Sequence, residues 1–203
     1  METLTSTQLL KRIRSATSDL SELRESKSVQ LKFWNAIRSL DLDILQWFWS
    51  MGSSTRHQVM NVDAYEHGLQ YGFTEIKFCE YGWLDNRDWI LTEELHFKLK
   101  EDKAYYNRIT LSCGINGSWA YGLSYNYGTG SGGGWAPSIY DKPFLSREAC
   151  LNAALDDLKD KMEHTITRAT AHPDPSNYNI SYMNKIVQLI QKEYASQVQL
   201  TLF

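Results

Sequence analysis

The spacing of apolar residues changes twice along this chain of 203 residues, from a helical period to strict alternation and back. Apolar and polar side chains alternate over three consecutive runs, around residues 91–99, 107–113 and 118–127. A period of two is typical of a strand with one buried and one wet face. Asn116-Gly117 separates the last two runs and favours a tight hairpin turn. We therefore expect an antiparallel meander of three to four strands, joined by an earlier strand around Thr74–Glu80.

Helical periodicity precedes the meander. One apolar stripe lies within the first 25 residues, and a second predicts a helix from about Ser28 to Trp49, broken by Met51-Gly52-Ser53-Ser54. The first stripe consists of Leu9, Ile13, Ala16, Leu20 and Leu23, and the second of Leu31, Trp34, Ile37, Leu40 and Ile44. The two helices predict a hairpin.

Two more helices are predicted after the meander. Ser146 has the chemistry of an N-cap, and the helix that follows it has a stripe ending at Met162. A linker at Ala171–Asn179 leads to an amphipathic helix that ends near Tyr194, and Ala195–Val198 serves as a spacer. The predicted fold class is α+β, with helices packed on one face of the sheet. The predicted divisions are a helical hairpin at 1–52, a sheet with one helix at 53–170, a linker and helix at 171–198, and a tail at 199–203.

Composition and charge exclude several classes of protein. The net charge of −3 argues against a surface that is basic all over. Residues 1–38 nevertheless contain seven basic and four acidic side chains, a net charge of +3. These helices either contact DNA or carry an ordinary solvated face.

The cysteines and the apolar runs point to a cytoplasmic protein without a membrane segment. Cys79, Cys113 and Cys150 are widely spaced, which indicates neither a disulfide framework nor a zinc site. The most apolar run, Ile44–Trp49, is too short to span a bilayer, and the first residues do not have the pattern of a signal peptide. No cofactor is predicted.

The sequence ends in Gln199-Leu200-Thr201-Leu202-Phe203. This pentapeptide resembles the peptides with which bacterial replication and repair proteins bind the DNA sliding clamp, the beta subunit of DNA polymerase III. The resemblance implies that Leu202 and Phe203 anchor in a hydrophobic pocket, that Gln199 forms hydrogen bonds beside it, that Leu200 is a lesser contact, and that Thr201 faces outward. It covers these five residues only. In the alternative interpretation, Leu202 and Phe203 belong to the protein's own core.

The resemblance implies an accessory protein of replication or repair, and such a tail on an unfamiliar body would suit a phage or mobile element. An alternative is a clamp-tethered, magnesium-dependent nuclease. Asp63 followed by Glu75-Ile76-Lys77 matches the carboxylates and lysine of many such enzymes. The pattern is weak, the five histidines are scattered, and no nucleophile motif is present. The sequence therefore favours a protein that is not an enzyme and binds no metal.

A glycine-rich segment at 128–134 follows the meander. It lacks the Lys-Ser/Thr and the helix that a phosphate-binding loop requires, so we interpret it as a flexible hairpin tip or linker. Trp135 follows it directly as a secondary contact for a partner, and a protein-interaction module unrelated to replication is the third hypothesis. The aromatic row Trp119, Tyr121, Tyr125 and Tyr127 either stacks on bases or, as is commoner, packs in the core.

Overall fold

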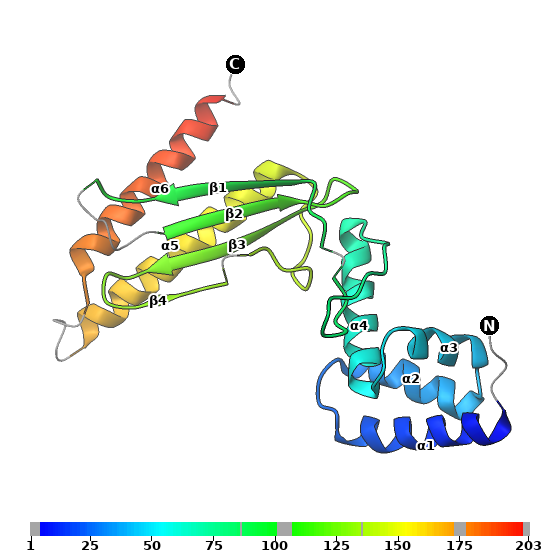
Figure 1. The fold of residues 1–203 in the computed structure, drawn as a ribbon. Helices are drawn as coiled ribbons and strands as arrows, with labels where there is room; N and C mark the ends of the chain where they lie inside the picture. Colours follow the sequence, from blue (N-terminus) through cyan, green and yellow to red (C-terminus); the bar gives the residue numbers. More distant parts are fainter. Residues whose placement is uncertain (1–4, 86, 101–106, 135, 173–177, 201–203) are drawn as a thin grey trace. The chain divides into compact units, whose positions relative to one another are not determined.

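The computed structural model describes residues 5–85, 87–100, 107–134, 136–172 and 178–200 (Figure 1). Its contacts divide the chain into unit 1, Met1–Arg87, and unit 2, Asp88–Phe203. Unit 1 is helical, and unit 2 contains an antiparallel sheet and two long helices. The predicted α+β class is confirmed.

Unit 1 has four α-helices and one short 3-10 helix among its described residues. Thr5 forms a capping box with Gln8 at the start of the first helix, and Asp41 and Ser54 cap the third and fourth helices through their side chains. The elements are α1 (Ser6–Glu22), α2 (Lys27–Ser39), α3 (Leu42–Ser50), α4 (Thr55–Gly68) and η1 (Leu69–Tyr71).

The predicted second helix is in fact two helices with a different buried face. Leu40 adopts a left-handed conformation with φ 53°, and this ends α2 before Asp41 caps α3. Leu31 and Leu40 are each 60% exposed, and the buried residues of α2 are Val29, Phe33 and Ala36. Apolar residues surround much of α2, so the sequence pattern alone did not identify the buried face.

The core of unit 1 extends beyond the predicted boundary at residue 52. Phe33 and Phe48 stack with their ring centroids 4.2 Å apart, and Val59 and Val62 of α4 belong to the same buried cluster. Because α4 contacts α1, α2 and α3, the unit continues to Arg87. The stripe predicted for α1 is correct, since Ala16 and Leu20 are buried.

The strand predicted around Thr74–Glu80 does not join the sheet. Residues 77–85 of unit 1 form a small hairpin instead, with an isolated bridge between Phe78 and Leu84. The amide N–H of Cys79 donates to Trp83, and that of Asp85 donates to Lys77. The hairpin bonds its backbone groups within itself and to the side chain of Asn61, so this segment does not require a place in a sheet.

Unit 2 contains a four-stranded antiparallel sheet in the order β1-β2-β3-β4. The turn at Asn116-Gly117 is confirmed: Gly117 has φ +83°, and Ser118 N–H donates to the Asn116 side chain at 3.1 Å. Trp119 pairs with Cys113 in the hairpin that follows from this turn. The strands are β1 (Leu91–Phe97), β2 (Asn107–Cys113), β3 (Trp119–Asn126) and β4 (Ser131–Gly132).

Helices α5 (Arg147–Ala171) and α6 (Ile180–Leu200) cover one face of this sheet (Figure 1). The predicted N-cap is confirmed, because the Ser146 hydroxyl accepts from Ala149 N–H at 3.1 Å. The odd-numbered residues of the strands face the helices, and Ile109, Leu111 and Leu123 are buried there with the apolar stripes of both helices. Among the described residues, no helix is long and apolar enough to cross a membrane.

Helix α6 continues further than the sequence predicted. Ala195–Val198, the expected spacer, is helical, and so is the backbone of Gln199 and Leu200. The last described contact of α6 with α5 is made by Tyr194, whose hydroxyl donates to Asn152 O and to Asp156 Oδ1. Ala195 and Ser196 beyond it are exposed.

Candidate functional site: a cleft between β3 and α5

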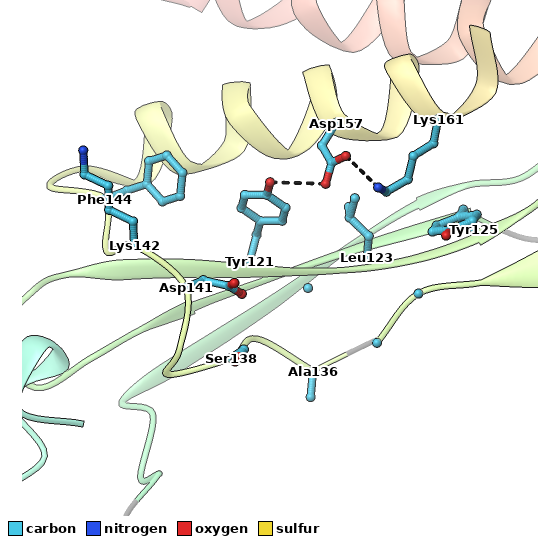
Figure 2. A pocket seen from close by; sticks show the side chains of 13 residues that line it. Tyr121, Leu123, Tyr125, Ala136, Ser138, Asp141, Lys142, Phe144, Asp157 and Lys161 are labelled. Carbon is cyan, nitrogen blue, oxygen red and sulfur yellow. Dashed lines mark hydrogen bonds and ion pairs between the residues drawn. The ribbon is translucent and has the colours of Figure 1, made fainter. Parts of the chain in front are cut away.

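An open cleft of about 530 Å³ lies beside strand β3. Figure 2 shows Tyr121, Leu123 and Tyr125 projecting from the strand toward α5, where Asp157 and Lys161 are located. The segment that connects β4 to α5 forms the other wall with Ser138, Asp141 and Lys142, among others. The volume is in the range of small-molecule sites, and the lining mixes aromatic rings with both signs of charge.

The cleft lies along the edge of β3 between two pairings of that strand. Trp119 exchanges two backbone hydrogen bonds with Phe144, and Tyr125 pairs with Gly132 of β4. Tyr121 and Leu123 lie between these two pairings and line the cleft.

A polar chain connects strand β3 to helix α5. The Tyr121 hydroxyl donates to Asp157 Oδ2 at 3.3 Å, Lys161 Nζ lies 2.9 Å from Asp157 Oδ1, and the Lys161 ammonium lies 5.5 Å from the centroid of Tyr125. Burial, followed by the neighbouring Asp157 carboxylate, raises the pKa of Tyr121 to about 12. The hydrogen bond with Asp157 raises the pKa of Lys161 above its ordinary value.

These pKa shifts indicate what the cleft does chemically. Tyr121 remains protonated and Lys161 remains charged at neutral pH, because both pKa values move away from 7. A general acid or base works best with a pKa near the working pH. The two groups are therefore suited to holding a ligand rather than to transferring protons.

The glycine strap, residues 128–134, forms part of the wall and is fitted closely to its neighbours. A Cβ on Gly133, which has φ +98°, would lie 2.2 Å from the Leu123 carbonyl oxygen. A Cβ on Gly132 would lie 2.7 Å from the Tyr125 hydroxyl, and one on Gly128 would lie 2.7 Å from Asn179 Cβ. At Gly133 the obstacle is backbone, whereas at Gly128 and Gly132 it is a neighbouring side chain. The expected hairpin tip is confirmed, because β4 pairs with β3 and Tyr127 N–H donates to Gly130 O at 2.8 Å, and residues 129–131, 133 and 134 are exposed.

The aromatic row on β3 packs as core. Trp119, Tyr121, Tyr125 and Tyr127 are partly buried against the apolar cluster of the sheet and helices. This confirms the core interpretation over base stacking. Two residues of the row also border the cleft, so their exposed edges remain available to a ligand.

The three residues of the nuclease hypothesis have simple local partners. Asp63 lies one turn before His67 on α4, with Oδ1 at 3.9 Å from His67 Nε2. Glu75 and Lys77 form an exposed ion pair at 2.8 Å. In the described part of the chain, no group of three or more His, Cys, Asp or Glu side chains is arranged to hold a metal ion. The geometry therefore adds no support to this hypothesis.

The other predicted binding residues fall largely outside the described part of the chain. Trp135 and residues 201–203 are not described, and only the helical backbone of Gln199 and Leu200 is.

Asp157 and Lys161 were not among the predicted site residues and were expected only as part of a helix. Their i, i+4 spacing on α5 was the available signal, because an acid and a lysine one turn apart form a pair.

Comparison with protein-family models finds no match, and comparisons with curated proteins and with solved structures find none either. The function therefore has to be argued from residues and geometry.

Proposed function

We propose that this protein is an accessory factor that docks on the bacterial DNA sliding clamp through Gln199–Phe203. The observation that carries the proposal is the pentapeptide itself, with two leucines and a phenylalanine in the order that clamp-binding peptides have. Leu202 and Phe203 provide the apolar anchors, and buried apolar anchors usually supply most of the energy of an interface.

The packing of α6 supports this use of the peptide. The buried residues of α6 are Tyr182, Met183, Ile186 and Ile190, and Tyr194 makes its last described contact with α5. Up to Ser196, the last residue whose side chain the structure describes, the residues of α6 that pack into the core of unit 2 end at Tyr194. Residues at a helix end unwind at little cost, so Gln199 and Leu200 can leave the helix when the peptide binds.

Calorimetric titration of the full chain into a purified bacterial sliding clamp tests the proposal. A short peptide of this kind gives a Kd on the order of micromolar. We expect Phe203→Ala to weaken binding at least about 30-fold, the effect of losing a principal anchor. Thr201→Ala, expected to face outward, is the matched control and should change the Kd less than about threefold.

Three outcomes would contradict the proposal. The first is no saturable binding by the full chain. The second is binding that survives truncation after Val198. The third is a truncated protein that no longer folds, because Leu202 and Phe203 would then be core residues. Thermal unfolding of the truncated protein distinguishes the third outcome from simple loss of binding.

A further inference from the structure

Three basic side chains on α1 have no carboxylate partner. Lys11, Arg12 and Arg14 are exposed, and none of them forms an ion pair with any residue that the structure describes. Two other basic residues of unit 1 are paired: Lys32 lies 2.7 Å from Glu66, and Arg56 lies 3.6 Å from Glu25. Lys11, Arg12 and Arg14 thus form a group of three cations within four residues in the first half of α1.

The electrostatics of the helix itself do not account for this charge. A cation stabilises a helix in its last turn, and α1 has no basic residue there. The two acidic residues of α1, Asp19 and Glu22, occupy its C-terminal half instead. The rest of the protein has a net negative charge, so the basic surface is local.

Lys11 and Arg12 border two neighbouring hollows that share Arg12 and Ser15. One hollow, of about 450 Å³, continues to Trp49 of α3 and to Ser53 and Ser54 before α4. The other, of about 360 Å³, is lined by Lys11 and Gln8 in addition to the shared residues. The molecule therefore combines cations, hydroxyl groups and an indole on one continuous surface.

Arg12 is held in place on this surface. Its guanidinium carbon lies 5.3 Å from the centroid of the Trp49 ring, and such stacking leaves the N–H groups at the rim free to donate. Asp19 occupies the far side of the larger hollow, where it accepts a hydrogen bond of 2.6 Å from the Thr55 hydroxyl. The anion-binding part of the surface is accordingly the side formed by Lys11, Arg12, Arg14 and Ser15.

We infer that this surface contacts the phosphodiester backbone of DNA. Guanidinium, ammonium and hydroxyl groups commonly contact the phosphate oxygens of DNA, and a guanidinium can bind one phosphate through two parallel hydrogen bonds. Lys11, Arg12 and Arg14 lie within about one turn of α1 and point in different directions around its axis, so they suit separate phosphates of a backbone better than a single anion. The inference stands independently of clamp docking, although a clamp-bound protein would hold this surface at high local concentration near DNA.

The test is fluorescence anisotropy of a labelled 30-mer, single-stranded in one arm and double-stranded in the other, titrated with the full chain. If the three cations neutralise about three phosphates, the affinity for duplex falls about 40-fold between 50 and 200 mM salt. The triple variant K11Q/R12Q/R14Q should remove most of this salt dependence. Lys27→Gln, at the opposite end of the α1–α2 pair, removes one charge and should leave the salt dependence of the DNA affinity unchanged.

Arg12→Lys separates charge from geometry. It keeps the positive charge but loses the planar contact with Trp49, so we expect a weaker affinity at the same salt slope. The inference is overturned if neither the single-stranded nor the double-stranded DNA binds at 50 mM salt. It is also overturned if Lys27→Gln lowers the salt dependence of the DNA affinity by a third of the decrease seen in the triple variant, because each removed charge would then count equally. Equal binding of polyglutamate of matched charge would also overturn it, because the surface would then not be selective for phosphate.

Discussion

Unit 1 and unit 2 each contain an irregular segment beside a buried core. A side chain anchors the first segment, whereas the second packs closely because its glycines have no side chains. Residues 77–85 of unit 1 are held by a side chain, since Asn61 Nδ2 donates to Met51 O and Gly82 O and Asn61 Oδ1 accepts from Leu84 N–H. The glycine strap of unit 2 is held by the absence of side chains, because its backbone contacts Leu123 and Tyr125 directly.

This difference determines which substitutions each segment tolerates. The unit 1 hairpin depends on one buried amide, so its tip is free to present exposed aromatic residues, Tyr81 and Trp83 among them. The strap is fitted closely at Gly128, Gly132 and Gly133 and has open space at Gly130 and Gly134, so the effect of an added side chain depends on the position. The comparison gives three predictions, in order of decreasing effect.

The largest effect is expected at Asn61, which is 1% exposed. Asn61→Ala removes three hydrogen bonds of 2.7–2.9 Å and leaves two carbonyls and one N–H buried without partners. We expect a loss of about 3–5 kcal/mol in the free energy of unfolding. Urea unfolding, together with faster hydrogen exchange in peptides covering 77–85, measures this. Asn35→Ala, at an exposed site of α2, is the matched control and should change stability by less than about 0.5 kcal/mol.

Gly133 is expected to show the next largest effect. Gly133→Ala places a Cβ against the Leu123 carbonyl oxygen and forces a left-handed φ on a residue with a side chain. The expected loss is about 2–3 kcal/mol, or an equivalent local opening of the strap. Hydrogen exchange across 121–134 distinguishes the two results. Gly130→Ala has open space around its Cβ and should be nearly neutral. Equal effects at the two glycines would refute the idea of a closely fitted strap.

The smallest effect concerns one ion pair from each unit. Glu93 of β1 accepts three hydrogen bonds from Arg147, two from Nε at 3.1 and 2.9 Å and one from Nη2 at 2.6 Å. The Lys32 ammonium lies 2.7 Å from both carboxylate oxygens of Glu66 in a more exposed pair. The Glu93 and Arg147 side chains are 29% and 42% exposed. Discounted for this exposure, Glu93→Gln should cost about 1 kcal/mol at pH 7, and Glu66→Gln about 0.3 kcal/mol.

The pH dependence of this effect has a definite sign. The hydrogen bond from Arg147 lowers the pKa of Glu93 below its ordinary 4.5. A lowered pKa stabilises the folded state above the unfolded value, and this contribution disappears as the pH falls through the folded pKa. The difference between wild type and Glu93→Gln should therefore be constant above about pH 5 and shrink below pH 4.5 in urea titrations. A difference that persists at pH 2 would contradict the assignment to this ion pair.

Much of unit 2 was predictable because its signals are local. The alternating runs fixed β1, β2 and β3, the Asn116-Gly117 turn fixed a hairpin, and Ser146 fixed the start of α5. The path of the glycine strap was not predictable. Glycine permits many conformations, and only the neighbouring Leu123 and Tyr125 select the one that is observed.

Unit 1 shows where a helical pattern becomes ambiguous. The sequence determined that α1 exists and which of its faces is buried, because its stripe has polar residues on both sides. It did not determine that Phe33 rather than Leu31 enters the core, or that Leu40 ends α2. Those outcomes depend on which helices pack against α2.

The sequence by itself therefore determined the fold class, the meander, the ends of several helices, the basic charge of the N-terminal helices and the peptide on which the clamp proposal rests. Tertiary structure alone brought Tyr121 to Asp157, 36 residues away, and set Arg12 of α1 over Trp49 of α3. Periodicity and capping act between residues a few positions apart, and they carry no information on which distant surfaces meet. Packing of the completed helices and strands decides that.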